Sequence, residues 1–263
     1  MRPLPAREGR EEPSFGLGFL AAVPLALFYE WSVARHGGSV RNSAERVLSL
    51  PLDPLGPAAD LIRPLVLLLC TLAALVVARR FALMHGRPLA ALVLRQPVEG
   101  FVGALLLGPA LIVSQRIFDS ASSPLGYAAS AGLAPSLETG ALVAGGAFHE
   151  ELVFRVGALA LAFIGWRALI GFFGSPTRAS ALAAEALAIV TAAGLFAAFH
   201  LDALSHWVGV RGESFDRSTF VWRFLGGCLL GALVRWRGFG VVAWTHAFFN
   251  LALLLGAGPR ELH

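Results

Sequence analysis

The sequence predicts an all-α protein that crosses a lipid bilayer several times, and three observations lead to this fold class. Hydrophobic residues make up 56% of the 263 residues, and the mean hydropathy is +0.69. Charged residues make up only 14%, against roughly 25% in soluble globular domains, which is too few to cover a water-facing surface. The apolar residues also fall in runs of about 20, the length of a helix that spans the hydrocarbon core. We therefore expect one polytopic integral membrane domain.

Apolar segments follow one another along the whole chain. They cover residues 15–33, 61–84, 98–118, 139–164, 181–206, 219–236 and 239–257. The fourth run could continue through Trp166–Gly174 as a short extra helix before Pro176. The sequence therefore predicts about seven to eight transmembrane helices.

The charges between these segments predict an orientation. The loop after the second run holds four arginines and no acid before Glu99, whereas residues 119–138 hold two acids and no base. Positively charged loops face the cytoplasm, so we expect the N-terminus to be cytoplasmic. Arginines near residues 35–46 and 211–217, in the loops assigned to the outside, count against this orientation. All 21 strongly basic residues are Arg and lie scattered between apolar runs, which argues against nucleic acid as a partner.

Charged side chains inside a membrane helix are the first candidates for function, because each costs at least about 2.5–3.5 kcal/mol to insert. In the fourth segment, Glu151 and Arg155 are spaced i, i+4 and share one helix face, with the acid N-terminal to the base. Glu150 points about 100° away from that face and has no partner within the motif. We expect Glu150 to face a cavity, although the three charges could also serve only to hold helices together. His149 and Glu150 begin a His-Glu-x-x-His zinc pattern, but Val153 replaces the second His and excludes it.

Two later segments carry further polar residues. His200 ends a nearly apolar stretch, and His246 and Asn250 are spaced i, i+4 on one face of the last helix. Taken singly, each could bond across helices as a packing contact, but together with Glu150 they indicate a site, since His and Asn can donate to an oxyanion. In the sixth segment, Gly227 and Gly231 form a small-xxx-small face, for which we expect a helix-packing role.

Three motifs occur in order on successive apolar helices: Glu-Glu-x-x-x-Arg at 150–155, Phe-x-x-x-His at 196–200 and His-x-x-x-Asn at 246–250. In this order they resemble the CPBP family, the CAAX-protease and bacteriocin-processing membrane endopeptidases, which include the Ras-converting enzyme. The resemblance covers about residues 139–255 and implies a CAAX-protease-like helical bundle. It divides the chain into a polar tail at 1–14, N-terminal transmembrane helices at 15–135, a catalytic core at 136–257 and a C-terminal tail at 258–263.

The resemblance implies an intramembrane protease with assigned residue roles. Glu150 and His200 would activate the attacking water, while His246 and Asn250 would stabilise the oxyanion. Glu151 and Arg155 match the family's supporting pair. Such hydrolysis needs a base and hydrogen-bond donors but no Ser or Cys nucleophile. The family has been described both as glutamate-type and as metal-dependent, and Glu150, His200 and His246 could supply a zinc set; we expect metal-independent catalysis without a cofactor.

The expected substrate is a membrane protein or lipidated peptide cleaved near its C-terminus, for example a hydrophobic tail next to a lipid-modified Cys, as in members of the myxosortase type. The all-Arg, Ala-rich and Gly-rich composition suggests a bacterium of high genomic GC content, and hence the bacterial inner (cell) membrane. A transporter or proton relay is one alternative, because intramembrane Glu, His and Arg also mark ion paths. Another is a non-catalytic immunity or binding protein on the same scaffold, in which the motif residues would often be lost.

Overall fold

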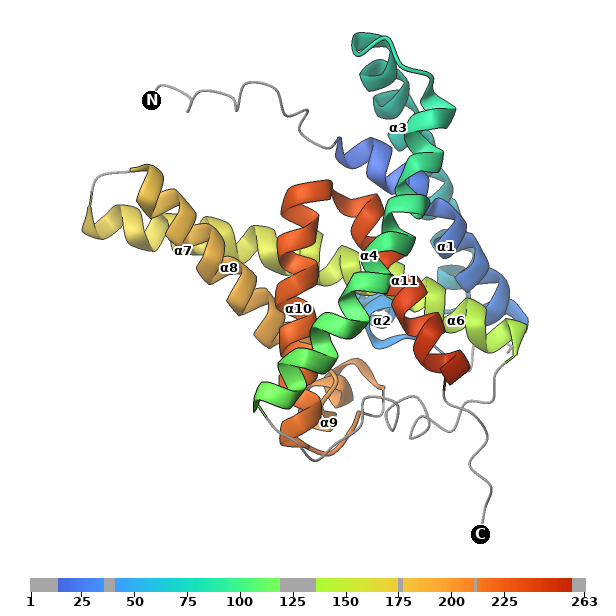
Figure 1. The fold of residues 1–263 in the computed structure, drawn as a ribbon. Helices are drawn as coiled ribbons and strands as arrows, with labels where there is room; N and C mark the ends of the chain where they lie inside the picture. Colours follow the sequence, from blue (N-terminus) through green and yellow to red (C-terminus); the bar gives the residue numbers. More distant parts are fainter. Residues whose placement is uncertain (1–13, 36–40, 119–135, 175–176, 211, 257–263) are drawn as a thin grey trace.

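The described residues are helical almost throughout, as Figure 1 shows. The computed structural model describes residues 14–35, 41–118, 136–174, 177–210 and 212–256. Within these ranges there is no strand, only one isolated bridge between Leu201 and Glu213. The all-α prediction is therefore confirmed. The two predicted tails, at 1–14 and 258–263, fall almost entirely outside the described residues.

Each of the predicted apolar runs forms a helix, with shorter helical segments between them. The elements are α1 (Phe15–Arg35), α2 (Ser43–Ser49), a 3-10 segment (Leu50–Ala58), α3 (Ala59–Met84), α4 (Leu89–Phe118), α6 (Leu137–Glu151), a π-helical segment (Leu152–Ala158), α7 (Leu159–Phe173), α8 (Arg178–Phe199), α9 (Asp202–Ser205), a 3-10 turn (His206–Val208), α10 (Arg217–Arg237) and α11 (Phe239–Gly256). The fourth run continues as a helix from α6 through the π-helical segment into α7, so the stretch from Trp166 to Phe173 extends that helix rather than forming a separate one.

Two further boundaries differ from the prediction by more than a few residues. Helix α4 begins at Leu89 rather than at residue 98, because Arg95, Gln96 and Pro97 lie within the helix rather than before it. The fifth helix ends at Phe199 rather than at residue 206. There the backbone N–H of Asp202 donates to the carbonyl of Glu213, which lies eleven positions further along the chain. This long-range contact ends the helix at the residue before His200.

Among the described residues, five helical stretches are long and apolar enough to cross a membrane, by length and composition. They are Phe15–Arg35, Ser43–Met84, Leu89–Val113, Leu137–Phe173 and Arg178–Phe199. The apolar part of α11, Phe239–Leu255, is shorter than these, and α10 carries four arginines. Many large hydrophobic side chains on α3, α4 and α7 are exposed, as lipid-facing side chains are. The chain is a polytopic all-α membrane protein.

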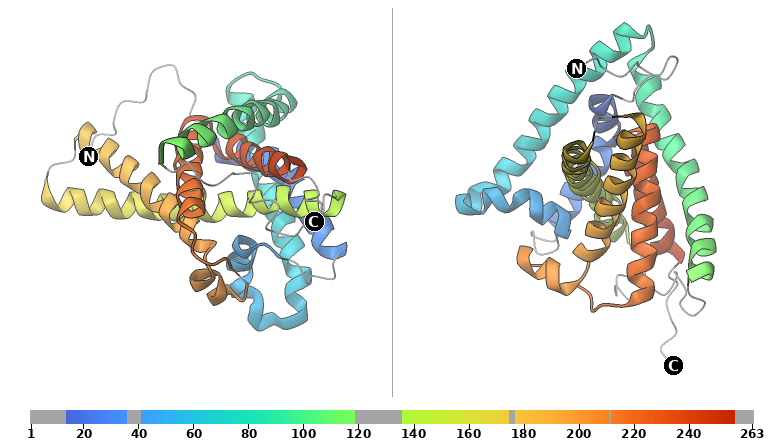
Figure 2. Two further views of the ribbon diagram at one scale, coloured as in Figure 1. Left: turned by 60° about the horizontal axis from the view of Figure 1, so that its bottom comes forward. Right: turned by 90° about the vertical axis from the view of Figure 1, so that its left-hand side faces the viewer.

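Helix α11 lies in the middle of the bundle. It packs against α4 and α6, and also contacts α1 and α10; Figure 2 shows it running between α4 and α6. The core shared by α1, α6 and α11 combines small residues, such as Ala22 and Ala247, with the rings of Phe19, Phe148 and Phe239. Helices α7 and α8 lie side by side and project from the bundle (Figure 1). This arrangement brings the C-terminal end of α6, the C-terminal end of α8 and the middle of α11 together.

Glycines permit the closest helix contacts around this region. A Cβ on Gly227 would lie 3.0 Å from Cα of Ala193, and a Cβ on Gly231 would lie 3.0 Å from Cγ2 of Ile189. Gly227 and Gly231 therefore face α8 at short range, which is the kind of packing that small residues permit between membrane helices. On α6, a Cβ at Gly145 would collide with Tyr29 of α1.

Candidate active site

A π-helical segment begins immediately after the two motif carboxylates. Helix α6 ends at Glu151, and Leu152–Ala158 continue it as a π-helix, in which the N–H of Leu159 donates to the carbonyl of Phe154. Short π-helical segments are rare and occur frequently at functional sites. Glu150 and Glu151 therefore lie where the continuous helix changes from α-helical to π-helical hydrogen bonding.

The side chains of Glu151 and Arg155 form a buried ion pair, as their spacing predicted. Arg155 Nε lies 3.1 Å from Glu151 Oε2, and both side chains are fully buried. The guanidinium also stacks over the Phe196 ring at 5.1 Å. The other carboxylate oxygen of Glu151 lies 2.8 Å from Nδ1 of His246. A carboxylate only accepts hydrogen bonds, so Nδ1 carries the proton and Nε2 points away from Glu151.

The carboxylate of Glu150 is held at one oxygen and faces a cavity with the other. Asn42 Nδ2 donates to Oε1 at 2.8 Å, and His246 Nε2 lies 3.6 Å from Oε2. The Glu150 side chain is 12% exposed, whereas that of Glu151 is not exposed at all. The two neighbouring acids are therefore in different environments, and Glu150 is the one open to a ligand.

His200 stands at the end of α8, directly after its last residue. Its Nδ1 lies 2.8 Å from the carbonyl of Phe196. Because a carbonyl only accepts, Nδ1 donates, and the Nε2 of the neutral ring is left as an acceptor. The ring of Phe196 packs edge-on against both His200, at 4.9 Å, and His246, at 5.9 Å. This Phe therefore fixes the position of both imidazoles.

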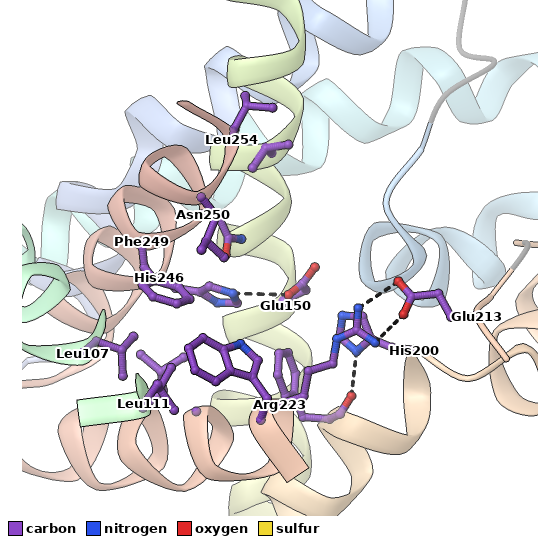
Figure 3. A pocket seen from close by; sticks show the side chains of 16 residues that line it. Leu107, Leu111, Glu150, His200, Glu213, Arg223, His246, Phe249, Asn250 and Leu254 are labelled. Carbon is purple, nitrogen blue, oxygen red and sulfur yellow. Dashed lines mark hydrogen bonds and ion pairs between the residues drawn. The ribbon is translucent and has the colours of Figure 1, made fainter. Parts of the chain in front are cut away.

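One cavity of about 340 Å³ collects the predicted residues (Figure 3). Glu150, His200, His246 and Asn250 all line it. Within the part of the chain that the structure describes, the Asn250 amide has no hydrogen-bond partner, so its donors are free for a ligand. The remaining wall is mostly apolar and comes from α4, α6, α8, α10 and α11: Leu107, Leu111, Val143, Phe196, Trp222, Gly226, Leu230, Phe249, Leu253 and Leu254.

Two further charged residues line the cavity that the sequence analysis did not single out, Glu213 and Arg223. The guanidinium of Arg223 binds both carboxylate oxygens of Glu213, each at 2.8 Å, and Figure 3 shows the pair beside His200. This hydrogen bonding lowers the pKa of Glu213 below its usual range. Arg223 lies inside the sixth apolar run, so the rule that picked out Glu150 also applied to it. Asn42, in contrast, gave no such signal.

His149 lies outside the cavity, although it directly precedes Glu150. Its Nδ1 lies 3.1 Å from the carbonyl of Gly145, and its ring packs 4.6 Å from that of Tyr29. The side chain is buried against α1. This position agrees with the exclusion of a His-Glu-x-x-His zinc site.

The described side chains do not form a metal-binding set. Among these residues, no group of three or more His, Cys, Asp or Glu lies close enough together to hold a metal ion. Glu150, His200 and His246 share the cavity, and both imidazoles have Nδ1 in a hydrogen bond and Nε2 outside one, but the three side chains do not form such a group in this structure. The zinc set considered from the sequence is therefore not assembled among the described side chains, and the reaction proposed below uses no metal.

Comparison with known proteins agrees with the motifs. Residues 133–252 match the family model described as "Type II CAAX prenyl endopeptidase Rce1-like". No curated protein and no solved structure matches the chain significantly. The matched segment contains Glu150, His200, His246 and Asn250. The match supports an intramembrane protease. The resemblance to the CAAX endopeptidase family is therefore confirmed over residues 133–252, which include all three motifs.

Proposed function

We propose that this protein is an intramembrane endopeptidase that cleaves a membrane-associated or lipidated protein near its C-terminus. One observation carries the proposal: Glu150 of α6, His200 after α8, and His246 and Asn250 of α11 meet in one cavity with otherwise largely apolar walls. Polar side chains inside membrane helices are costly and rare, so four of them at one point favour chemistry over packing.

In the proposed reaction, Glu150 acts as the general base. Its Oε1 is occupied by Asn42, and its Oε2 remains for a water molecule. The Nε2 of His200 is an acceptor and would hold and orient the same water. As the water oxygen bonds to the carbonyl carbon, its proton passes to Glu150; when the carbon–nitrogen bond breaks, that proton is delivered to the leaving nitrogen. No covalent bond forms between the enzyme and the substrate.

Asn250 and His246 would stabilise the oxyanion of the tetrahedral intermediate. The Asn250 amide is unpartnered among the described residues and can donate into the cavity. His246 can donate from Nε2 only as an imidazolium, because Nδ1 already donates to Glu151. The carboxylates of Glu151, at 2.8 Å, and Glu150, at 3.6 Å, provide the negative charge next to such a cation.

The apolar wall of the cavity supports a hydrophobic substrate. Leu107 and Leu111 of α4, Trp222 of α10 and Phe249 of α11 line the cavity, and Figure 3 shows Leu107 and Leu111 on the side away from His200 and Glu213. A membrane-embedded or lipid-modified peptide segment has the matching chemistry.

Cleavage of co-expressed substrates by wild type and variants tests the proposal. Wild type, Glu150→Ala and His200→Ala are each co-expressed with candidate membrane substrates, and the substrate C-termini are read by mass spectrometry. Glu185→Gln is the matched control, because Glu185 pairs with Arg235 away from the cavity. We expect shortened C-termini with wild type and Glu185→Gln alone. Equal cleavage by Glu150→Ala and wild type would show that the base is assigned wrongly.

A further inference from the structure

The candidate base accepts a hydrogen bond from a residue in the N-terminal part of the chain. Asn42 lies 108 positions before Glu150, outside the segment that matches the endopeptidase family. Its Nδ2 is nevertheless 2.8 Å from Glu150 Oε1. The N-terminal half of the chain, which carries none of the motif residues, therefore contacts the candidate base directly.

The geometry around Asn42 identifies which side of its amide faces Glu150. Oδ1 accepts from the backbone N–H of Ala44 at 2.8 Å and so caps the N-terminus of α2. Turning the amide over would place two donors against each other at Ala44 and two acceptors against each other at Glu150. The hydrogen-bond chemistry therefore fixes Nδ2 as the donor to the carboxylate.

The backbone of Asn42 is fixed as firmly as its side chain. Its N–H donates to the Tyr29 hydroxyl at 2.7 Å, and its carbonyl accepts from the N–H of Arg46 at 3.0 Å. Tyr29 is itself fully buried on α1. Asn42 thus has its backbone and both ends of its amide in hydrogen bonds, to α1, to α2 and to Glu150 of α6.

A glycine on α6 leaves room for this approach. Gly146 lies one helical turn before Glu150, and a Cβ placed there would be 2.9 Å from Asn42 Nδ2. Any side chain at this position would push the amide away from the carboxylate. The surface of α6 is therefore shaped for Asn42 to reach Glu150.

From this geometry we propose that Asn42 is a positioning residue for the proteolytic reaction. It acts through Glu150: its donor holds Oε1, so that Oε2 is the oxygen presented to the water in the cavity. The inference rests on the proposed function, in which Glu150 is the base. It adds a role for the N-terminal helices beyond forming part of the membrane bundle.

Two substitutions separate positioning from folding. Asn42→Ser and Asn42→Thr both keep a helix-capping hydroxyl oxygen, but neither side chain is long enough to reach Glu150 as the Asn42 amide does. We expect the KM and the melting temperature to stay near wild type while kcat falls about ten- to a hundredfold, the range for losing a hydrogen bond to a charged group. Gly146→Ala should also lower kcat, because the added methyl group would displace the Asn42 amide.

The matched control is Thr177→Ala. Thr177 caps α8 by accepting from the N–H of Ser180 at 3.0 Å, at the end of the helix far from His200. Loss of this cap should leave kcat unchanged.

The outcomes separate the two proposals. If wild type cleaves and both Asn42 variants keep kcat within about twofold of it, the positioning role is overturned and the proposed function stands. A fall in kcat for Thr177→Ala equal to that for the Asn42 variants would also overturn it. If wild type itself cleaves no candidate substrate, the proposed function fails and this inference fails with it.

Discussion

His246 Nδ1 lies 2.8 Å from Glu151 Oε1, and the Nε2 of the same ring lies 3.6 Å from Glu150 Oε2. The contact with Glu151 places a proton on Nδ1, because a carboxylate cannot donate when ionised. A neutral ring would then offer only an acceptor to the cavity, whereas an imidazolium would offer a donor. The role of His246 in the reaction is therefore decided by whether Nε2 carries a proton.

Replacing His246 by Gln distinguishes a donor from a base. Gln supplies an amide donor near the position of Nε2 but cannot take up a proton. We expect His246→Ala to lower kcat by about 10²–10³, the usual cost of losing one oxyanion donor, and His246→Gln to recover part of that loss. Steady-state kinetics on a cleaved substrate measures both. If the two variants are equally inactive, donation by His246 is not its role.

The buried pair of Glu151 and Arg155 should matter most for stability. Glu151→Gln leaves the Arg155 guanidinium buried beside a neutral amide, and breaking a buried ion pair in this way costs about 3–5 kcal/mol. The double variant Glu151→Gln/Arg155→Met removes the stranded charge, so we expect it to unfold at a higher temperature than Glu151→Gln alone. Thermal unfolding in detergent checks the order. Strictly additive losses would show that the pair is not coupled in the folded protein.

The pair of Glu213 and Arg223 should add an acid-sensitive contribution. The pKa of Glu213 is lowered in the folded protein by its hydrogen bonds from Arg223. A lowered folded-state pKa stabilises the fold above the unfolded value of about 4.3, and this contribution is lost as the pH falls through the folded pKa. The side chain is half exposed, so the gain is at most about 1 kcal/mol after solvent screening.

Comparison of wild type with Glu213→Gln over a range of pH isolates that contribution. The difference in unfolding free energy should be constant near neutral pH and should shrink below about pH 4.3. If this difference in unfolding free energy stays constant or grows as the pH falls below about 4.3, the stabilising effect of Arg223 on ionised Glu213 is contradicted.

Removal of divalent metals should leave the activity intact. The described residues contain no set of three or more His, Cys, Asp or Glu able to hold a metal ion, and the chemistry proposed for Glu150 and His200 needs none. We expect protein treated with a chelator, and shown by elemental analysis to be free of zinc, to cleave at the wild-type rate. Loss of activity that added zinc restores would refute metal-independent hydrolysis.

Contacts within one helix were open to prediction from the sequence. The pair of Glu151 and Arg155 follows from the i, i+4 spacing alone, and the same periodicity separates Glu150 from it. The shared face of His246 and Asn250 is predicted in the same way, and both residues line the cavity. Helical geometry is local, so these relationships do not depend on how the helices pack.

Contacts between distant segments were not predictable from one sequence. Asn42 reaches Glu150 across 108 positions, and nothing in the polar stretch around it sets it apart from any other helix-capping Asn. The early end of α8 likewise depends on Glu213, which pairs with the backbone beside His200. Both contacts depend on tertiary packing, which cannot be read from the helical periodicity or the composition of the sequence.

The central claim, that Glu150 is the base of a proteolytic reaction, is tested most directly by kcat of purified Glu150→Gln on a membrane substrate that the wild type cleaves. Gln keeps the shape of the side chain and an oxygen that can accept from Asn42, so the cavity should be preserved. Loss of a general base predicts a fall of about 10²–10⁴ in kcat with the melting temperature unchanged. A kcat within about threefold of wild type would contradict the claim.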